Sequence, residues 1–139
     1  MISGLSHMTF MVKDLDRAAE FWGKILGAKE VYSREANSSP TVKYFLLNDL
    51  WIALNKGEPL PERTYNHIAF AISDSDFDMY IARIQDVGTE IDPGRTRRDG
   101  EGRSIYFYDF DNHMFELHTG SLVERMTHYS KTADSRWPT

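Results

Sequence analysis

The sequence contains no cysteine and no long apolar run, and each absence excludes a class of protein. Without cysteine, neither a disulfide bond nor a thiol nucleophile on the chain is available. No apolar stretch approaches the roughly 20 residues that a membrane-spanning helix needs. The first ten residues also lack the basic and apolar segments of a signal peptide. We therefore expect a cytoplasmic protein with no membrane partner.

Positive charge is also scarce. The chain has 16 Lys and Arg against 21 Asp and Glu, and its formal net charge of −5 argues against a nonspecific nucleic-acid binder. Its 139 residues, 41% of them hydrophobic, suffice for the core of one domain. The composition therefore predicts a single globular domain without a nucleic-acid partner.

What the sequence does contain is an internal repeat. Residues 4–31 match residues 64–91 at an offset of 60, so that His7 falls on His67. Each copy begins with a strand of alternating apolar residues, continues with a helix that ends at a glycine, and adds three more strands. The repeat predicts an α+β fold of two paired βαβββ modules.

The repeat also sets the expected boundaries. We assign residues 1–60 to the first module and 61–126 to the second, and we expect 127–139 to form a C-terminal tail. Two polar segments, 35–41 and 93–103, are rich in turn residues and are predicted to be loops.

Alternation in the strands separates the side chains that pack under the helices from those on the opposite face. The residues expected on that opposite face are His7, Thr9, Met11, His67, Ala69, Ala71, Ser104, Tyr106, Tyr108, Met114, Glu116 and His118. Polar groups are therefore gathered on one concave face, where two modules would curve around a cavity.

Three of these residues form a candidate metal site. His7, His67 and Glu116 offer two imidazoles and a carboxylate, which suit Mn²⁺, Fe²⁺, Co²⁺, Ni²⁺ or Zn²⁺. Three protein ligands leave positions open for water or substrate, as in catalytic sites. The first-module counterpart of Glu116 is Ala53, which cannot bind a metal, so we expect three protein ligands and no fourth.

The other histidines receive different roles. His113 falls in a predicted turn and His128 near the tail, so both are predicted to be surface residues. His118 lies on the correct face but further along its strand, and we expect it to support the site or line its mouth.

The segments GLSHMTF (from Gly4), YNHIAF (around His67) and GEGRSIYFYDFDNHMFELHTG (residues 100–120) resemble the vicinal oxygen chelate superfamily. In that superfamily, βαβββ modules pair to form a metal-holding cup. More narrowly, the sequence is similar to the fosfomycin-resistance proteins, and most to their FosX subgroup. The segment SLVERM, which contains Arg125, extends the match over nearly all of residues 1–126.

The resemblance implies a domain-swapped homodimer whose modules pair across the interface. His7 of one subunit would then join His67 and Glu116 of the other around Mn²⁺, although other divalent metals also suit these ligands. The implied substrate is fosfomycin, a small epoxide that carries a phosphonate. A divalent metal would act as a Lewis acid and stabilise the alkoxide that forms as the ring opens.

The resemblance also implies roles for further side chains. The residues it places around the substrate are Tyr65, Arg97, Ser104, Tyr106, Arg125 and Trp51. The candidates for a direct part in the chemistry are Thr9, Tyr106 and Glu35. An arginine, hydroxyl groups and a metal suit a dianionic phosphonate.

One position departs from the FosX pattern. That subgroup uses a glutamate, just ahead of a Lys-aromatic-Phe-Leu strand, as the general base for the attacking water. Here the matching residue is Val42, which cannot accept a proton. Glu35 could take over this role if its loop folds inward. Relatives that add a thiol, glutathione or bacillithiol, do not need the base, and Thr9 and Tyr44 match residues typical of the glutathione-using subgroup.

The sequence thus favours FosX-like hydration of the epoxide by water, with thiol addition as the alternative. Two other hypotheses stay open. The same metal cup could serve an isomerase or an iron-dependent dioxygenase. The fold could also belong to a non-catalytic drug-binding protein, although the bleomycin-resistance relatives of that kind generally lack the metal triad.

Overall fold

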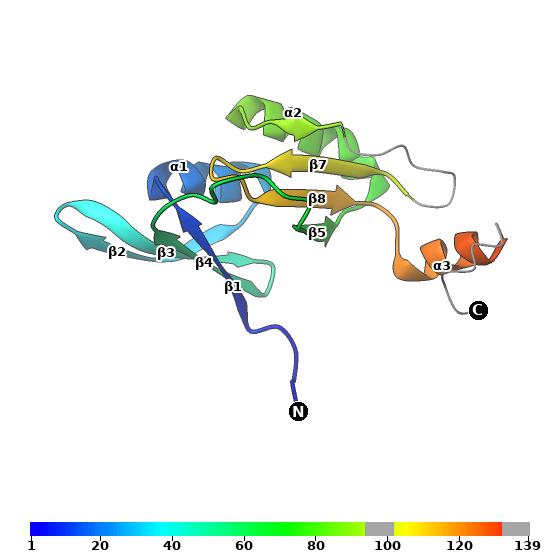
Figure 1. Ribbon diagram of the computed structural model, residues 1–139, viewed down its shortest axis with the longest axis horizontal. Helices are drawn as coiled ribbons and strands as arrows, with labels where there is room; N and C mark the ends of the chain where they lie inside the picture. The colour runs from blue at the N-terminus through cyan, green and yellow to red at the C-terminus, as the bar shows by residue number, and fades with distance from the viewer. Residues whose placement is uncertain (94–101, 132–139) are drawn as a thin grey trace.

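The computed structural model describes residues 1–93 and 102–131, and within them two four-stranded sheets (Figure 1). The first has the order β1-β4-β3-β2 and comprises β1 (His7–Val12), β2 (Lys29–Ala36), β3 (Ser39–Leu47) and β4 (Leu50–Lys56). The second has the order β5-β8-β7-β6 and comprises β5 (His67–Ala71), β6 (Ile91–Asp92), β7 (Ser104–Tyr108) and β8 (Met114–His118). In each sheet the first strand pairs in parallel with the last, and the other pairs are antiparallel. This shared topology confirms the predicted α+β fold of two βαβββ modules.

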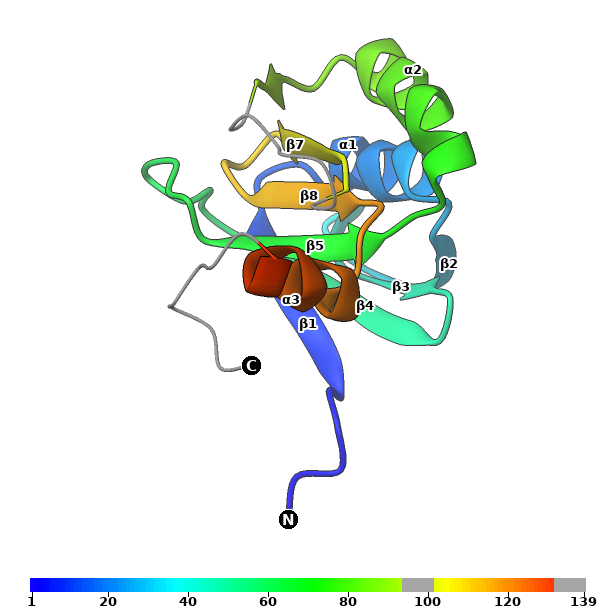
Figure 2. The ribbon, with the colours of Figure 1, turned by 90° about the vertical axis from the view of Figure 1, so that its right-hand side faces the viewer.

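Two of the helices cover one side of the two sheets, and the last helix lies to the side of the second sheet (Figure 1). The helices are α1 (Leu15–Glu20), a π-helix (Phe21–Ile25) that continues it, α2 (Phe77–Val87) behind a 3-10 turn (Asp74–Asp76), and α3 (Leu122–Lys131). The Asp14 carboxylate caps α1 by accepting a hydrogen bond from Arg17 N at 3.1 Å. α2 ends at Gly88, whose φ of 90° suits a residue without a side chain. α2 lies beside α1 and its π-helical continuation (Figure 2).

One apolar core joins the helices to both sheets. Trp22 of the π-helix is fully buried and meets Phe115 of β8 edge-on at 5.3 Å and Phe10 of β1 at 5.6 Å. Its neighbour Phe21 packs 5.7 Å from Phe107 of β7. Because one helix contacts strands of both sheets, the two modules share their hydrophobic core within a single chain.

The structure corrects the prediction of a loop at residues 35–41. β2 and β3 continue through this segment to a two-residue turn at Asn37 and Ser38, whose φ values are 54° and 61°. Positive φ at both central residues fits a type I′ hairpin turn, in which the strands keep their twist. The resulting hairpin projects beyond the body of the molecule (Figure 1). Most of the other predicted loop, 93–103, lies outside the described residues.

The last helix crosses a predicted module limit, and none of the described helices is suited to span a membrane. The module limits at residues 60 and 126 stay predictions, and α3 (Leu122–Lys131) runs past the second of them, to the side of the second sheet (Figure 1). Within residues 1–93 and 102–131, no helix combines the length and the apolar character that crossing a membrane requires.

Candidate metal and anion site

Each sheet has a face that points away from α1 and α2, which we call the open face. In the second sheet it carries three cross-strand rows, which are His67, Met114 and Tyr108, then Ala69, Glu116 and Tyr106, then Ala71, His118 and Ser104. The intervening residues Phe115 and Leu117 lie in the core. Strand alternation therefore placed the polar residues of β5, β7 and β8 correctly, and it brings Glu116 to the middle of the open face.

The Glu116 side chain is buried, with 6% exposure, and contacts the side chains of Ser104, His118 and His67. Its Oε2 accepts a hydrogen bond from Ser104 Oγ at 2.5 Å and lies 3.3 Å from His118 Nδ1. Ser104 Oγ is in turn 2.7 Å from the same nitrogen. The other oxygen, Oε1, lies 3.0 Å from His67 Nε2. Ser104 and His118 therefore fix the carboxylate and leave Oε1 for His67.

The hydrogen bonds of His67 indicate where a cation belongs. Its Nδ1 lies 2.7 Å from the carbonyl oxygen of Tyr65. A carbonyl oxygen only accepts hydrogen bonds, so Nδ1 carries the proton and a neutral ring presents a lone pair at Nε2. That lone pair faces the Glu116 carboxylate, another acceptor. Two acceptors 3.0 Å apart need a positive charge between them, either a second ring proton or a metal ion.

His7, the third predicted ligand, lies on the open face of the first sheet. Its ring stacks on Trp51, with centroids 4.1 Å apart, and its Nδ1 is 3.0 Å from Ser6 Oγ. In the part of the chain that the structure describes, no three His, Cys, Asp or Glu side chains are close enough to hold a metal. A single chain therefore brings together His67 and Glu116, while His7 remains on the other sheet.

A small cavity of about 240 Å³ adjoins the carboxylate. Glu116 and His118 line it from β8, and the first turns of α3 bring Arg125 to its wall. Sequence reasoning placed Arg125 in the site only through the resemblance. The structure supplies a direct reason, because the turn after β8 returns α3 to the end of the strand that carries Glu116.

Tyrosines line the open face beside Glu116. The exposed Tyr65 donates its hydroxyl proton to the hydroxyl of the buried Tyr106 at 3.4 Å. Burial raises the pKa of the Tyr108 phenol, and the negative charge of Asp92 raises it further. Tyr106, in the same cross-strand row as Glu116, thus brings a hydroxyl group to the open face beside the carboxylate.

The remaining predicted site residues are dispersed. Thr9 and Trp51 lie on the open face of the first sheet, and Arg97 lies outside the described residues. Glu35 is exposed in β2, opposite Pro40 near the hairpin tip. The structure therefore does not bring Glu35 to His67 or Glu116 within one chain.

Val42 occupies the centre of β3, between Arg34 of β2 and Asn55 of β4. It lies two residues from Tyr44 and so shares the open face of the first sheet, where it is 8% exposed.

The surface prediction for His113 was wrong. Its side chain is 11% exposed, its Nδ1 lies 2.8 Å from Asp109 Oδ2, and its ring meets Phe10 edge-on at 5.0 Å. Asp109 Oδ1 accepts hydrogen bonds from the backbone N of Asp111 and of His113, which folds the turn back on itself. The Asp-to-His spacing of four in a tight turn was the available signal. His128, also predicted at the surface, is half-buried on α3.

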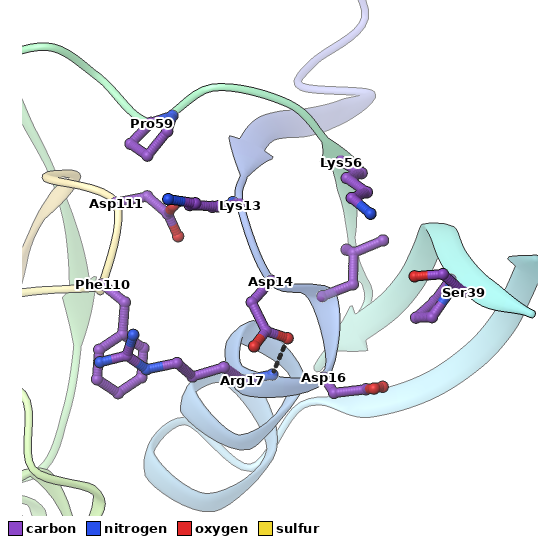
Figure 3. Close-up of a pocket in the computed structure, with 11 residues that line it drawn as sticks. Lys13, Asp14, Asp16, Arg17, Ser39, Lys56, Pro59, Phe110 and Asp111 are labelled. Atoms are coloured by element: carbon purple, nitrogen blue, oxygen red, sulfur yellow. Dashed lines mark hydrogen bonds between the residues drawn. The ribbon is translucent and has the colours of Figure 1, made fainter.

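Another cavity, of about 540 Å³, lies elsewhere (Figure 3). It is found where the start of α1 meets the turn between β7 and β8, and its described lining includes no histidine. Its charged groups join the two modules: Asp111 Oδ1 accepts a hydrogen bond from Lys13 N at 2.9 Å, and the Arg17 guanidinium lies 3.7 Å over the Phe110 ring. This cavity is separate from the candidate site.

Comparison with known proteins identifies the family of this chain. The sequence model of the Glyoxalase/Bleomycin resistance protein/Dioxygenase superfamily matches residues 4–117. This match includes β1 to β8 except the last residue of β8.

Individual relatives are more specific. The fosfomycin resistance protein FosX of Mesorhizobium japonicum is 53% identical over 133 residues, covering 94% of this chain and 96% of the relative. The metallothiol transferase FosB of Shouchella clausii is 38% identical and covers 96% and 91% of the two chains. A crystal structure of a mutant FosX from Listeria monocytogenes, complexed with Mn(II) and 1S,2S-dihydroxypropylphosphonic acid, superposes with a TM-score of 0.85 at 53% identity over 93% of this chain and 99% of that one.

Proposed function

Because the chain belongs to the Glyoxalase/Bleomycin resistance protein/Dioxygenase superfamily, we propose that it is a metal-dependent fosfomycin resistance enzyme that opens the epoxide of fosfomycin. One observation carries this proposal, the facing pair of His67 Nε2 and Glu116 Oε1 at 3.0 Å. The pair requires a positive charge between its two acceptor atoms, and a FosX structure 53% identical to this chain is complexed with Mn(II), so we assign Mn²⁺ as the cofactor.

The metal is held by His67 and Glu116 of one chain and by His7 of a second copy, in a domain-swapped homodimer. The separation of His7 from the other two ligands within one chain supports this arrangement. Bound Mn²⁺ supplies Lewis acidity toward the epoxide and phosphonate oxygens. Ser104 keeps the Glu116 carboxylate in place through its 2.5 Å hydrogen bond.

The phosphonate of the substrate binds beside Glu116. Arg125 lines the same cavity and provides a planar guanidinium for two phosphonate oxygens. The hydroxyls of Tyr106 and Tyr65 provide further donors, and Ser104, whose proton goes to Glu116, borders the phosphonate site. Thr9 acts from the first sheet, and Arg97, which lies outside the described residues, stays a candidate phosphonate contact.

Water is the proposed nucleophile, so that the product is a diol. The 53% identity to FosX, against 38% to FosB, supports hydration, as does the dihydroxypropylphosphonic acid in the FosX complex. Val42 favours a second candidate, the addition of a thiol, because valine cannot deprotonate water. Glu35, the carboxylate proposed to act as base in its place, lies exposed near the hairpin tip.

The product assay separates these reactions. Manganese-loaded protein is incubated with fosfomycin, with and without glutathione or bacillithiol, and followed by phosphorus NMR. We expect diol in every sample. A thiol adduct without diol would establish the second candidate, and the absence of both products would refute the proposed function. His67→Ala and Glu116→Gln, checked for folding by circular dichroism, should lower the rate by roughly 100-fold or more.

A further inference from the structure

The two histidines that the repeat places at equivalent positions are oriented by different contacts. His67 has a backbone carbonyl at 2.7 Å from Nδ1 and Glu116 at 3.0 Å from Nε2. Among the described residues, the one polar contact of the His7 ring is the hydroxyl of its exposed neighbour Ser6, 3.0 Å from Nδ1. The register places Ala53 where the second sheet has Glu116. His7 therefore lacks the polar contacts that fix the plane of the His67 ring.

Aromatic rings take the place of those contacts. Trp51 stacks on His7 with centroids 4.1 Å apart and an interplanar angle of 30°. Tyr44 meets Trp51 edge-on at 5.2 Å, and Tyr32 lies 5.1 Å from Tyr44. These four rings, which we call the aromatic ladder, come one each from β1, β4, β3 and β2, the spatial order of the sheet. The ladder thus crosses the whole first sheet and ends at His7.

Packing alone holds the indole of Trp51. Its Nε1 is buried and has no hydrogen-bond partner among the described residues, so the ring plane is set by Tyr44 on one side and His7 on the other. At the same register position in the second sheet, the residue beside His67 is Met114. Methionine is flexible and does not fix the plane of a neighbouring ring.

We propose that Trp51 is a positioning residue for His7. Its indole face holds the imidazole plane, and Ser6 accepts the Nδ1 proton, which leaves Nε2 for the metal. The metal-binding part of this inference rests on the proposed function. Trp51 would then orient His7 in addition to contacting the substrate. Tyr44 and Tyr32 would act indirectly, by holding the Trp51 ring in place.

The test compares Trp51→Leu, which removes the stacked ring, with Trp51→Phe, which keeps one. Two quantities are measured: the Mn²⁺ dissociation constant, from the electron paramagnetic resonance signal of free Mn²⁺, and the His7 tautomer in metal-free protein, from nitrogen-15 NMR of the ring. We expect Trp51→Leu to weaken Mn²⁺ binding about tenfold and to mix the two tautomers. Trp51→Phe should remain within about threefold of wild type with one dominant tautomer.

Met114→Leu provides the matched control in the second sheet. It is similar in volume, and because His67 is held by hydrogen bonds, neither Mn²⁺ binding nor the His67 ring signals should change. If Trp51→Leu does not fold, Tyr44→Leu removes the ring that holds Trp51 and should give a smaller shift in the same direction.

The outcomes distinguish the inference from the function. If Trp51→Leu leaves Mn²⁺ affinity and the His7 signals unchanged while the KM for fosfomycin rises, Trp51 is a substrate contact only and the inference is overturned. If wild-type protein binds no Mn²⁺, the proposed function fails instead. The tautomer measurement in metal-free protein then still decides whether Trp51 orients His7.

Discussion

In the second sheet Glu116 lies between Ala69 and Tyr106, and at the same place in the first sheet Ala53 lies between Thr9 and Tyr44. The next row along the strands repeats this contrast. The second sheet has His118 and Ser104 there, whereas the first has Asn55 and Val42. The two modules thus share a backbone arrangement and a tyrosine in the row of Glu116, but they differ at the carboxylate and at the two residues, His118 and Ser104, that hold it.

This difference shows how a duplicated unit can divide one site. The second module keeps the carboxylate and the groups that hold it, while the first contributes an imidazole at the end of an aromatic ladder. Neither open face has all three proposed ligands, so the proposed metal site requires the two faces to meet. The contrast therefore predicts that the loss of a metal ligand from one module can be compensated only by the same module of a second chain.

The largest effect is expected from mixing two inactive variants. His7→Ala and Glu116→Gln should each abolish fosfomycin opening when they are assayed alone. If the ligands come from different chains, a mixed dimer contains one site with His7, His67 and Glu116 all intact. Refolding the variants together makes half of the dimers mixed, each with one intact site of two, so roughly a quarter of wild-type activity should return.

Phosphorus NMR of the refolded mixture measures the recovery, and each variant refolded with itself is the control. If the mixture stays inactive although gel filtration shows dimers, the three ligands belong to one chain. The proposed division of the site between modules would then be wrong.

The second prediction concerns the row that holds Val42. Val42→Glu restores a base on the open face of the first module, and diol formation should rise by about 100-fold, the lower range for general-base catalysis. Val42→Gln is the matched control, because it has nearly the same size but accepts no proton at neutral pH. An equal rise in both variants would attribute the effect to polarity and not to proton transfer.

A third prediction compares an arginine from each module. Arg125→Ala should raise the KM for fosfomycin about tenfold, since a charge-assisted hydrogen bond to the phosphonate is lost. Arg125→Lys should recover part of this loss, because lysine supplies charge without the paired donors. Arg34→Ala, on the exposed strand β2, is the control and should leave KM near wild type. Similar effects of both alanine variants would indicate long-range attraction and not a contact.

Sequence alone was sufficient for the residues that alternate along buried strands. In β1 and β5 every second side chain enters the core, so His7 and His67 could be assigned to the open face without coordinates. The repeat likewise predicted Ala53 as the counterpart of Glu116, and the strand register confirms it.

The failures have a common physical cause. β2 is exposed along its whole length, so no core-facing alternation showed that the strand continues through Glu35 and Ala36, and the turn at Asn37 did not stand out within the polar segment 35–41. The burial of His113 depends on Phe10, about a hundred residues earlier in the chain, and on a turn that folds back on Asp109. Tertiary contacts of this kind leave no local pattern. The stacking of Trp51 on His7 was missed for the same reason.

The smallest expected effect lies at the junction of the modules, where Asp111 accepts the hydrogen bond from Lys13 N. Burial raises the pKa of the Asp111 carboxyl, the hydrogen bond from Lys13 opposes this, and the charge of Asp109 adds to it. The folded protein therefore holds this proton more tightly than the unfolded chain. The linked stability is greatest below the unfolded pKa of about 4 and is lost as the pH rises through the folded pKa.

Asp111→Asn keeps an acceptor for Lys13 N and removes the buried charge. At pH 7 its free energy of unfolding should equal or exceed that of wild type by up to about 1 kcal/mol, and the difference should vanish toward pH 3. Urea unfolding at several pH values measures this, with Asp49→Asn, in the exposed turn of the first module, as the matched control. A loss of stability at pH 7 confined to Asp111→Asn would mean that the carboxylate charge itself joins the modules. The junction would then depend on electrostatic attraction, and the raised pKa would be the wrong guide to its energetics.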